Sequence, residues 1–230
     1  MDKAAQERLD KVLKSPVPTK LRNLDVQEFT TTLVKLYAEL DYIHPFSDVN
    51  SRTLRTFTRQ LAKESGYELD WTRFNASEVG RDLLYIARER SVNLLAKPHI
   101  QHEQSMRKIV HSMDRLEGNK DLAGLLQDVV RPNRAVAFEK LPEDEALQQH
   151  PELATAYRTL QEASVYFTTK LPESREVLQQ AIKSVAKHIQ EYLNQGEYRN
   201  FGAARDAAKA ERSVEPPSVQ APEKSPGRGR

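Results

Sequence analysis

Cysteine is absent from the 230 residues of this chain. Its absence excludes disulfides, thiolate nucleophiles and sulfur-ligated zinc or iron sites, and it is typical of proteins that work in a reducing compartment. Long hydrophobic runs are missing too, since none approaches the roughly 20 apolar residues of a membrane-spanning helix. The N-terminal sequence MDKAAQERLDKVLK is charged throughout and lacks the apolar stretch of a secretory signal peptide. We therefore expect no membrane partner and a cytoplasmic protein.

The chain also lacks an excess of one charge. Its 35 Lys and Arg residues stand against 33 Asp and Glu residues, for a net charge of +2. Because an excess of positive charge favours binding to nucleic acid or anionic membranes, this near balance indicates neither partner. Arg81, Arg88 and Arg90, with the acids beside them, are typical of a solvated helix face. Only 7% of the residues are aromatic and the mean hydropathy is −0.69, which indicates a modest core.

Apolar periodicity predicts helices along most of the chain. Apolar residues recur at intervals of three and four over residues 29–43, 54–62, 106–116, 153–167 and 178–193, the spacing of one helix face. Asp25 is placed to cap the first of these helices, and Gly66 to end the second. The predicted fold class is all-α.

Composition suggests how these helices are grouped. We expect a helical domain over residues 1–130 and a linker over 131–145, RPNRAVAFEKLPEDE, because prolines and mixed charges gather there. A C-terminal helical module follows over 146–200, whose two helices can pair as an antiparallel hairpin. We expect a disordered Pro-rich tail over 201–230, since its apolar surface is too small to offset the entropy of ordering.

The segment DYIHPFSDVNSRTLRTF, residues 41–57, joins two predicted helices and gathers side chains suited to phosphate chemistry. The start of a helix offers unpaired backbone N–H groups and the positive end of the helix dipole, so it attracts phosphate. Asn50, Ser51 and Arg52 would lie there. Arg52 and Arg55 are one turn apart, where two guanidinium groups could clamp a polyphosphate.

Two further residues of this segment suit the same chemistry. Asp48 is a lone carboxylate, and one carboxylate beside phosphates is a common way to hold Mg²⁺. His44 titrates near neutral pH and suits removal of a proton from an attacking hydroxyl. Together these are the parts that phosphoryl or nucleotidyl transfer requires, because that chemistry is mainly positioning and charge neutralisation. The structural alternative is an ordinary loop between two helices.

At these residues the sequence resembles the Fic (filamentation induced by cAMP) family. The family signature is H-P-F-x-[DE]-G-N-G-R-x-x-R, and this chain has H-P-F-S-D-V-N-S-R-T-L-R. The resemblance extends over about residues 20–75 and faintly to 130. It implies a Fic-like helical domain and a bacterial protein adenylyltransferase, which transfers AMP from ATP to a Ser, Thr or Tyr hydroxyl of a target protein. Cytoplasmic action is expected, and translocation as an effector stays open.

The resemblance also assigns roles to residues by their position in the motif. It implies ATP as the substrate and Mg²⁺ as the cofactor. His44 would be the general base and Asp48 the Mg²⁺ ligand. Asn50 would form hydrogen bonds with the phosphates, and Arg52 and Arg55 would bind the β and γ phosphates. Phe46 would anchor the loop in the core, and the backbone N–H groups from Val49 to Ser51 would form an anion hole.

The chain departs from the family pattern in three respects. The two motif glycines are Val49 and Ser51 here, and a β-branched valine disfavours positive φ. No alternating strand pattern precedes the helix at 27–43, so we expect the family's upstream β-hairpin flap to be missing or supplied by another chain. We find no [ST]-x-x-x-E-[GN] inhibitory helix in the sequence, so regulation by a separate small antitoxin-like partner stays open. The alternatives are an inactive Fic remnant that serves as a binding or regulatory module, and a different nucleotidyl or phosphoryl transfer.

Overall fold

The computed structural model describes residues 3–14, 17–170 and 175–196. Apart from one pair of three-residue strands, its regular elements are helices, which confirms the predicted all-α class. The elements in chain order are α1 (Lys3–Leu13), α2 (Pro18–Leu21), α3 (Val26–Ile43), α4 (Asn50–Glu64), β1 (Tyr67–Leu69), α5 (Thr72–Asn75), α6 (Glu78–Ala96), η1 (Lys97–His99), α7 (Glu103–Leu116), α8 (Leu122–Gln127), β2 (Val130–Pro132), α9 (Asn133–Lys140), α10 (Glu143–Gln149), η2 (Pro151–Leu153), α11 (Ala154–Lys170) and α12 (Arg175–Gln195).

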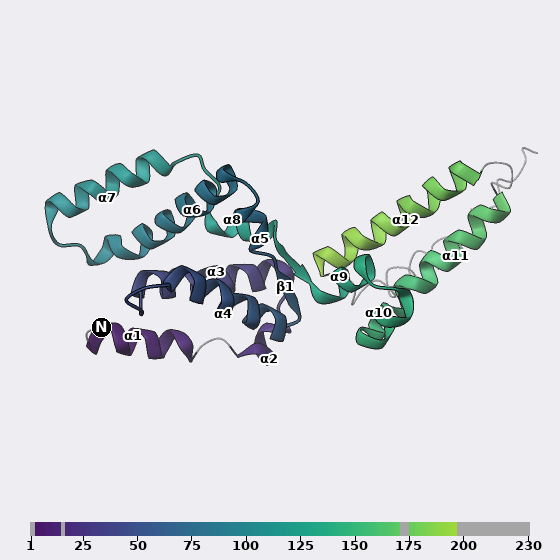
Figure 1. Cartoon of the computed structure of the whole chain (residues 1–230), viewed down its shortest axis with the longest axis horizontal. Helices are drawn as coiled ribbons and strands as arrows, with labels where there is room; N and C mark the ends of the chain where they lie inside the picture. The colour runs from purple at the N-terminus through teal and green to yellow at the C-terminus, as the bar shows by residue number, and fades with distance from the viewer. Residues whose placement is uncertain (1–2, 15–16, 171–174, 197–230) are drawn as a thin grey trace, which may run out of the picture.

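Helix α3 lies at the centre of the first module, which comprises α1 to α8 (Figure 1). It contacts α1, α4, α6 and α8, and its apolar stripe enters the first core. The helix begins where the sequence predicts, because the Asp25 carboxylate accepts the Glu28 N–H at 2.7 Å while the Glu28 carboxylate accepts the Asp25 N–H at 3.3 Å. This reciprocal cap satisfies two N–H groups that the helix itself leaves unpaired.

The strand pair joins distant parts of the chain. Gly66, at a φ of +87°, follows α4, and β1 pairs antiparallel with β2, Tyr67 opposite Pro132. The Tyr67 ring stacks on Phe29 with centroids 4.1 Å apart, and its hydroxyl donates to the Leu24 carbonyl at 2.6 Å. The strand pair is thereby fixed against the start of α3.

Residues 131–145, which we expected to be a linker, contain regular structure. The structure places the end of β2, all of α9 and the start of α10 there. Pro132 ends β2, and Pro142 immediately precedes α10. Proline is tolerated at both places because neither needs an intrahelical N–H donor, so the prolines mark element boundaries.

The second module, α9 to α12, has a core of its own. Its buried residues are Ala135, Ala137, Ala146, Leu153, Ala156, Ile189 and Leu193. Helices α11 and α12 pack side by side as the predicted antiparallel hairpin (Figure 1). The described part of α12 begins at Arg175, and the tail expected at 201–230 lies outside the described residues.

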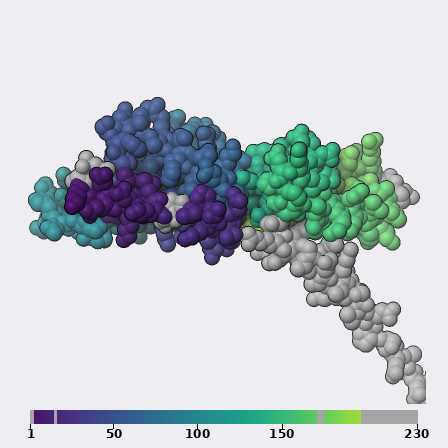
Figure 2. Space-filling view, turned by 90° about the horizontal axis from the view of Figure 1, so that it is seen from below, coloured from purple at the N-terminus to yellow at the C-terminus, as the bar shows by residue number. Residues whose placement is uncertain are grey.

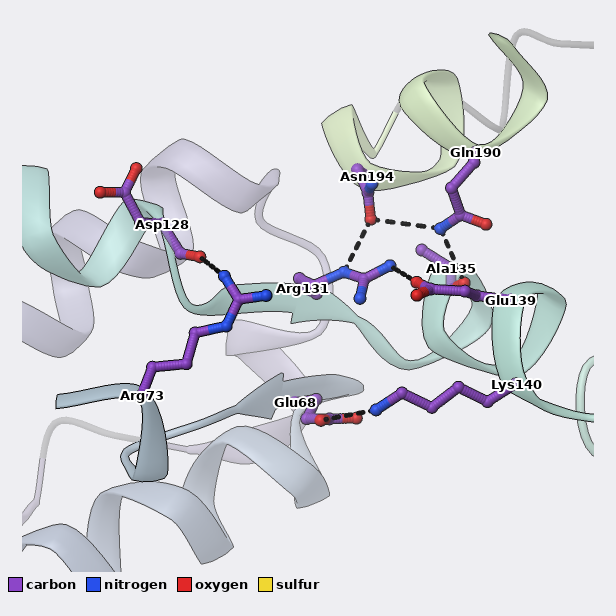
Figure 3. Close-up of polar contacts among 9 residues, drawn as sticks. All are labelled: Glu68, Arg73, Asp128, Arg131, Ala135, Glu139, Lys140, Gln190 and Asn194. Atoms are coloured by element: carbon purple, nitrogen blue, oxygen red, sulfur yellow. Dashed lines mark hydrogen bonds and ion pairs between the residues drawn. The ribbon is translucent and has the colours of Figure 1, made fainter. Parts of the chain in front are cut away.

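Polar contacts attach the second module to the strand pair (Figure 3). Arg131 of β2 donates from Nε to Asn194 of α12 at 3.0 Å and forms an ion pair with Glu139 of α9. Lys140 of α9 lies 3.5 Å from the carboxylate of Glu68 in β1. The two modules consequently lie end to end along the long axis of the molecule (Figure 2).

Two further expectations concern a flap upstream of α3 and membrane-spanning helices. Upstream of α3 the described residues form helices α1 and α2, with no strand among them. None of the described helices is both long and apolar enough to cross a membrane.

Candidate functional site

The motif loop, residues 44–49, connects α3 to α4. His44 ends α3 in the left-handed conformation, at a φ of +49°, and its backbone N–H still donates to the Leu40 carbonyl at 3.1 Å. This conformation turns the chain sharply out of the helix. The His44 side chain is exposed, as a general base that meets a substrate must be.

Asn50 closes the motif loop. Its side-chain amide accepts the Phe46 N–H at 3.0 Å and donates to the Phe46 carbonyl at 2.6 Å, and the residue is only 4% exposed. From the sequence we expected Asn50 to bind phosphates, but here both ends of its amide hold the loop backbone. The Phe46 side chain, which we expected to anchor the loop in the core, is 48% exposed. The loop is therefore held by the Asn50 amide and not by burial of the Phe46 ring.

The first turn of α4 begins at a strained residue. Val49 precedes the helix at a φ of +58°, the left-handed region that a β-branched side chain rarely adopts. The Asp48 carboxylate accepts the Val49 N–H at 2.6 Å. None of the described side chains caps α4. Its first-turn N–H groups therefore offer the donors that an anion would use.

The two motif arginines have different surroundings. Arg52 is exposed, and the described residues offer it neither an ion pair nor a side-chain hydrogen bond. Arg55 is half-buried and donates from Nε to the Ser51 carbonyl at 3.2 Å and from Nη1 to Asn75 at 3.5 Å. Beside Arg52 lies a surface hollow of about 530 Å³, whose lining is Val49, Arg52, Thr53, Thr56 and Phe57. Arg52 is thus the cation that remains available to a phosphate.

Asp48 suits the magnesium ion that the motif implies. The described residues contain no group of three acidic or histidine side chains that could cage a metal. Mg²⁺ bound with a nucleotide does not need such a cage, because it takes one or two carboxylates, substrate phosphates and water. The exposed Asp48 carboxylate at the end of the loop fits this donor set.

A polar network that the sequence did not reveal lies behind the loop. Arg88 of α6 forms two hydrogen bonds with Asp41 of α3, at 2.8 and 3.0 Å, and donates from Nη1 to the Ser51 hydroxyl at 3.3 Å. From the sequence we expected Arg88 on a solvated face, but its side chain is 14% exposed. Burial works to lower the pKa of Arg88, yet the bonds to Asp41 and the nearby Tyr37 and Tyr85 together raise it.

The network was not visible in the sequence because its members are far apart in the chain. Asp41 and Arg88 are 47 residues apart, and no motif connects them. The available signal was weak: buried Leu84 and Ala87 mark the inner face of α6, and Arg88 follows them directly. Periodicity places a residue near a face, but it does not identify a partner on another helix.

Comparison with known proteins gives two matches. Over 61 residues, 26% of this chain, the sequence is 46% identical to the protein adenylyltransferase VbhT of Bartonella schoenbuchensis. Over 66 residues, 29% of the chain, it is 35% identical to a protein adenylyltransferase of Bartonella henselae. These segments span 13% and 12% of the two relatives. No protein-family model and no solved structure matches the chain.

The matches agree with the motif, because both relatives are named for the activity that the Fic signature implies. Over about a quarter of its length, this chain is similar to protein adenylyltransferases, which supports its resemblance to the Fic family.

Proposed function

We propose that this chain is a protein adenylyltransferase, with its active site at the motif loop and the first turn of α4. The observation that carries the proposal is the grouping of an exposed His44, an exposed Asp48 and an unpaired Arg52 around a helix start that no described side chain caps. The likeness to two proteins named adenylyltransferases supports it. ATP is then the substrate and a Ser, Thr or Tyr hydroxyl of a target protein the acceptor.

The reaction needs one proton transfer and one displacement at phosphorus. His44 takes the proton of the acceptor hydroxyl, whose oxygen attacks the α-phosphorus of ATP. The bond from the α-phosphorus to the oxygen that it shares with the β-phosphorus breaks, and pyrophosphate leaves with the electron pair of that bond. Arg52 and the first-turn N–H groups of α4 stabilise the charge on the phosphates. Asp48 would hold Mg²⁺, which supplies further charge neutralisation.

The decisive experiment uses ATP labelled at the α-phosphate, Mg²⁺ and a bacterial lysate. We expect the wild type to label protein, and His44→Ala to lose about 100-fold or more of that rate, since a general base contributes about 10²- to 10⁴-fold. The matched control is His111→Ala, which changes an exposed histidine on α7, far along the chain from the loop. Equal labelling by wild type and His44→Ala would refute the proposed base.

Nucleotide binding tests the phosphate site separately from chemistry. We expect Arg52→Ala to weaken ATP binding about 10-fold or more, because charge-assisted hydrogen bonds contribute about 1.5–3 kcal/mol each. Arg59→Ala is the control, because Arg59 is an exposed arginine of the same helix that lines a different cavity. If Arg52→Ala binds ATP as tightly as Arg59→Ala does, the phosphate site is not at this helix start.

The strained Val49 favours a second candidate, a nucleotide-binding or regulatory module without transferase activity. This candidate predicts ATP binding that depends on Arg52, with no label transferred by the wild type to any protein. The same labelling experiment therefore separates the two functions.

A further inference from the structure

Arg88 connects the two helices that flank the motif loop. Its guanidinium holds the carboxylate of Asp41, in the last turn of α3, through Nε–Oδ2 and Nη2–Oδ1 bonds of 3.0 and 2.8 Å. Its third nitrogen, Nη1, donates to the hydroxyl of Ser51, in the first turn of α4, at 3.3 Å. One side chain of α6 therefore contacts the chain just before the loop and just after it.

The Arg88 side chain is tightly constrained by its burial and by its bonds to Asp41. The Asp41 and Arg88 side chains are 6% and 14% exposed, and both oxygens of Asp41 are engaged by one planar fork. The Tyr37 and Tyr85 rings lie 5.9 and 5.7 Å from the Arg88 guanidinium carbon. A buried pair of this kind specifies orientation more than it adds net stability, because desolvation offsets most of the attraction.

Ser51 stands at the second glycine position of the Fic signature. A glycine there would have no side-chain acceptor for Nη1, so this contact depends on the residue in which this chain departs from the signature. The serine hydroxyl lies in a turn that begins at the strained Val49 and whose N–H groups have no side-chain cap.

We propose that Arg88 is a positioning residue, which acts through the Ser51 hydroxyl to hold the first turn of α4 in its phosphate-binding arrangement. Asp41 orients the Arg88 fork for this task. The inference rests on the proposed function for its effect on ATP, but the constraint on the loop itself can be measured without any nucleotide.

The first test is hydrogen exchange of the full chain without nucleotide. We expect amides of residues 44–52 to exchange about fivefold faster in Ser51→Ala and in Arg88→Lys, since one lost hydrogen bond loosens the local structure by about 1 kcal/mol. Exchange in the middle of α3 should rise less than exchange in the loop, and the thermal midpoint of Ser51→Ala should fall by no more than about 2–4 °C, the shift that corresponds to about 1 kcal/mol. The controls are Ser91→Ala and Arg90→Lys, whose side chains bond the Ala87 and Asn119 carbonyls away from the loop.

The second test is a double-mutant cycle read in ATP affinity. If Arg88 acts through Ser51, the double variant Ser51→Ala/Arg88→Lys binds ATP no more weakly than Arg88→Lys alone. Additive losses would mean that Arg88 acts by another route and would overturn the inference.

The two tests distinguish failure of this inference from failure of the proposed function. Loop exchange that is unchanged in both single variants overturns the positioning role, whether or not the protein uses ATP. If the loop exchanges faster in both variants but the wild type binds no ATP, the positioning role is upheld and the proposed function is refuted.

Discussion

The side-chain amide of Asn50 holds both backbone groups of Phe46, accepting its N–H at 3.0 Å and donating to its carbonyl at 2.6 Å. This pair of bonds converts four residues of loop into a closed turn that delivers the chain to the start of α4. The turn sets where the exposed His44 and Asp48 lie relative to the helix that follows.

Removing this amide is therefore expected to cost stability. We expect Asn50→Ala to lower the free energy of unfolding by about 1–3 kcal/mol, because it removes a buried amide and leaves the N–H and the carbonyl of Phe46 without their part-buried partner. Urea denaturation measures the change. The control is Asn23→Ala, which loses one long bond of 3.4 Å at an exposed position. Equal stability of the two variants would mean that the loop does not depend on Asn50.

Replacing Val49 should raise the stability of the protein, whereas replacing Asn50 should lower it. Its φ of +58° is strained for valine but not for glycine, and its side chain is 41% exposed. We expect Val49→Gly to stabilise the protein by about 0.5–1 kcal/mol, since relief of strain of about 1–2 kcal/mol outweighs the entropy that glycine loses. Val79→Gly, in the helical part of α6, should instead destabilise by about 0.3–0.5 kcal/mol, the difference in helix propensity between valine and glycine. Thermal unfolding of both variants decides whether the strain is real.

The buried Tyr37 hydroxyl predicts a loss of stability at high pH. Burial raises the pKa of Tyr37 to about 12 from 10.0, and Arg88 nearby offsets only part of the rise. Because the folded state disfavours the ionised ring, this contribution to stability is intact below pH 10 and is lost as the pH rises to 12.

Urea denaturation across this range measures the contribution. Between pH 10 and 12 the free energy of unfolding of the wild type should fall by about 2 kcal/mol more than that of Tyr37→Phe. Tyr85→Phe is the control, because the Tyr85 side chain is 64% exposed. Parallel curves for the wild type and Tyr37→Phe would show that the hydroxyl ionises as freely in the folded state as in the unfolded one.

Because each module has a hydrophobic core of its own, a substitution in the second core should destabilise the second module without changing the nucleotide site in the first. Leu153 is 0% exposed in the second core, so Leu153→Ala should destabilise the second module by about 2–5 kcal/mol. ATP affinity should not change, because α3 and α4, the helices on either side of the motif loop, pack in the first core. Leu94→Ala, at an exposed leucine, is the control for stability. A loss of ATP affinity in Leu153→Ala would show that the second module supports the nucleotide site.

Several local features were readable from the sequence because their causes are local. Asp25 with Glu28 forms the cap that starts α3, and Gly66 and Gly196 follow α4 and α12 at positive φ. Apolar spacing likewise placed α3 and α4 on either side of the motif. The short elements within 131–145 were not foreseen, because prolines look alike in a linker and at the ends of short elements.

The sequence by itself determined the helical class and the motif residues, since helix period, caps and residue spacing act between near neighbours. It also supplied the proposal of phosphate chemistry, because that rests on which side chains share one loop. The tertiary structure alone decided that Asn50 serves the loop, that Phe46 faces outward and that Arg88 joins Asp41 to Ser51. The Arg88 contacts depend on how three helices pack, and packing brings together residues that no local pattern connects. The Asn50 bonds join residues four apart, but the spacing alone does not show whether the amide turns toward the loop or toward a ligand.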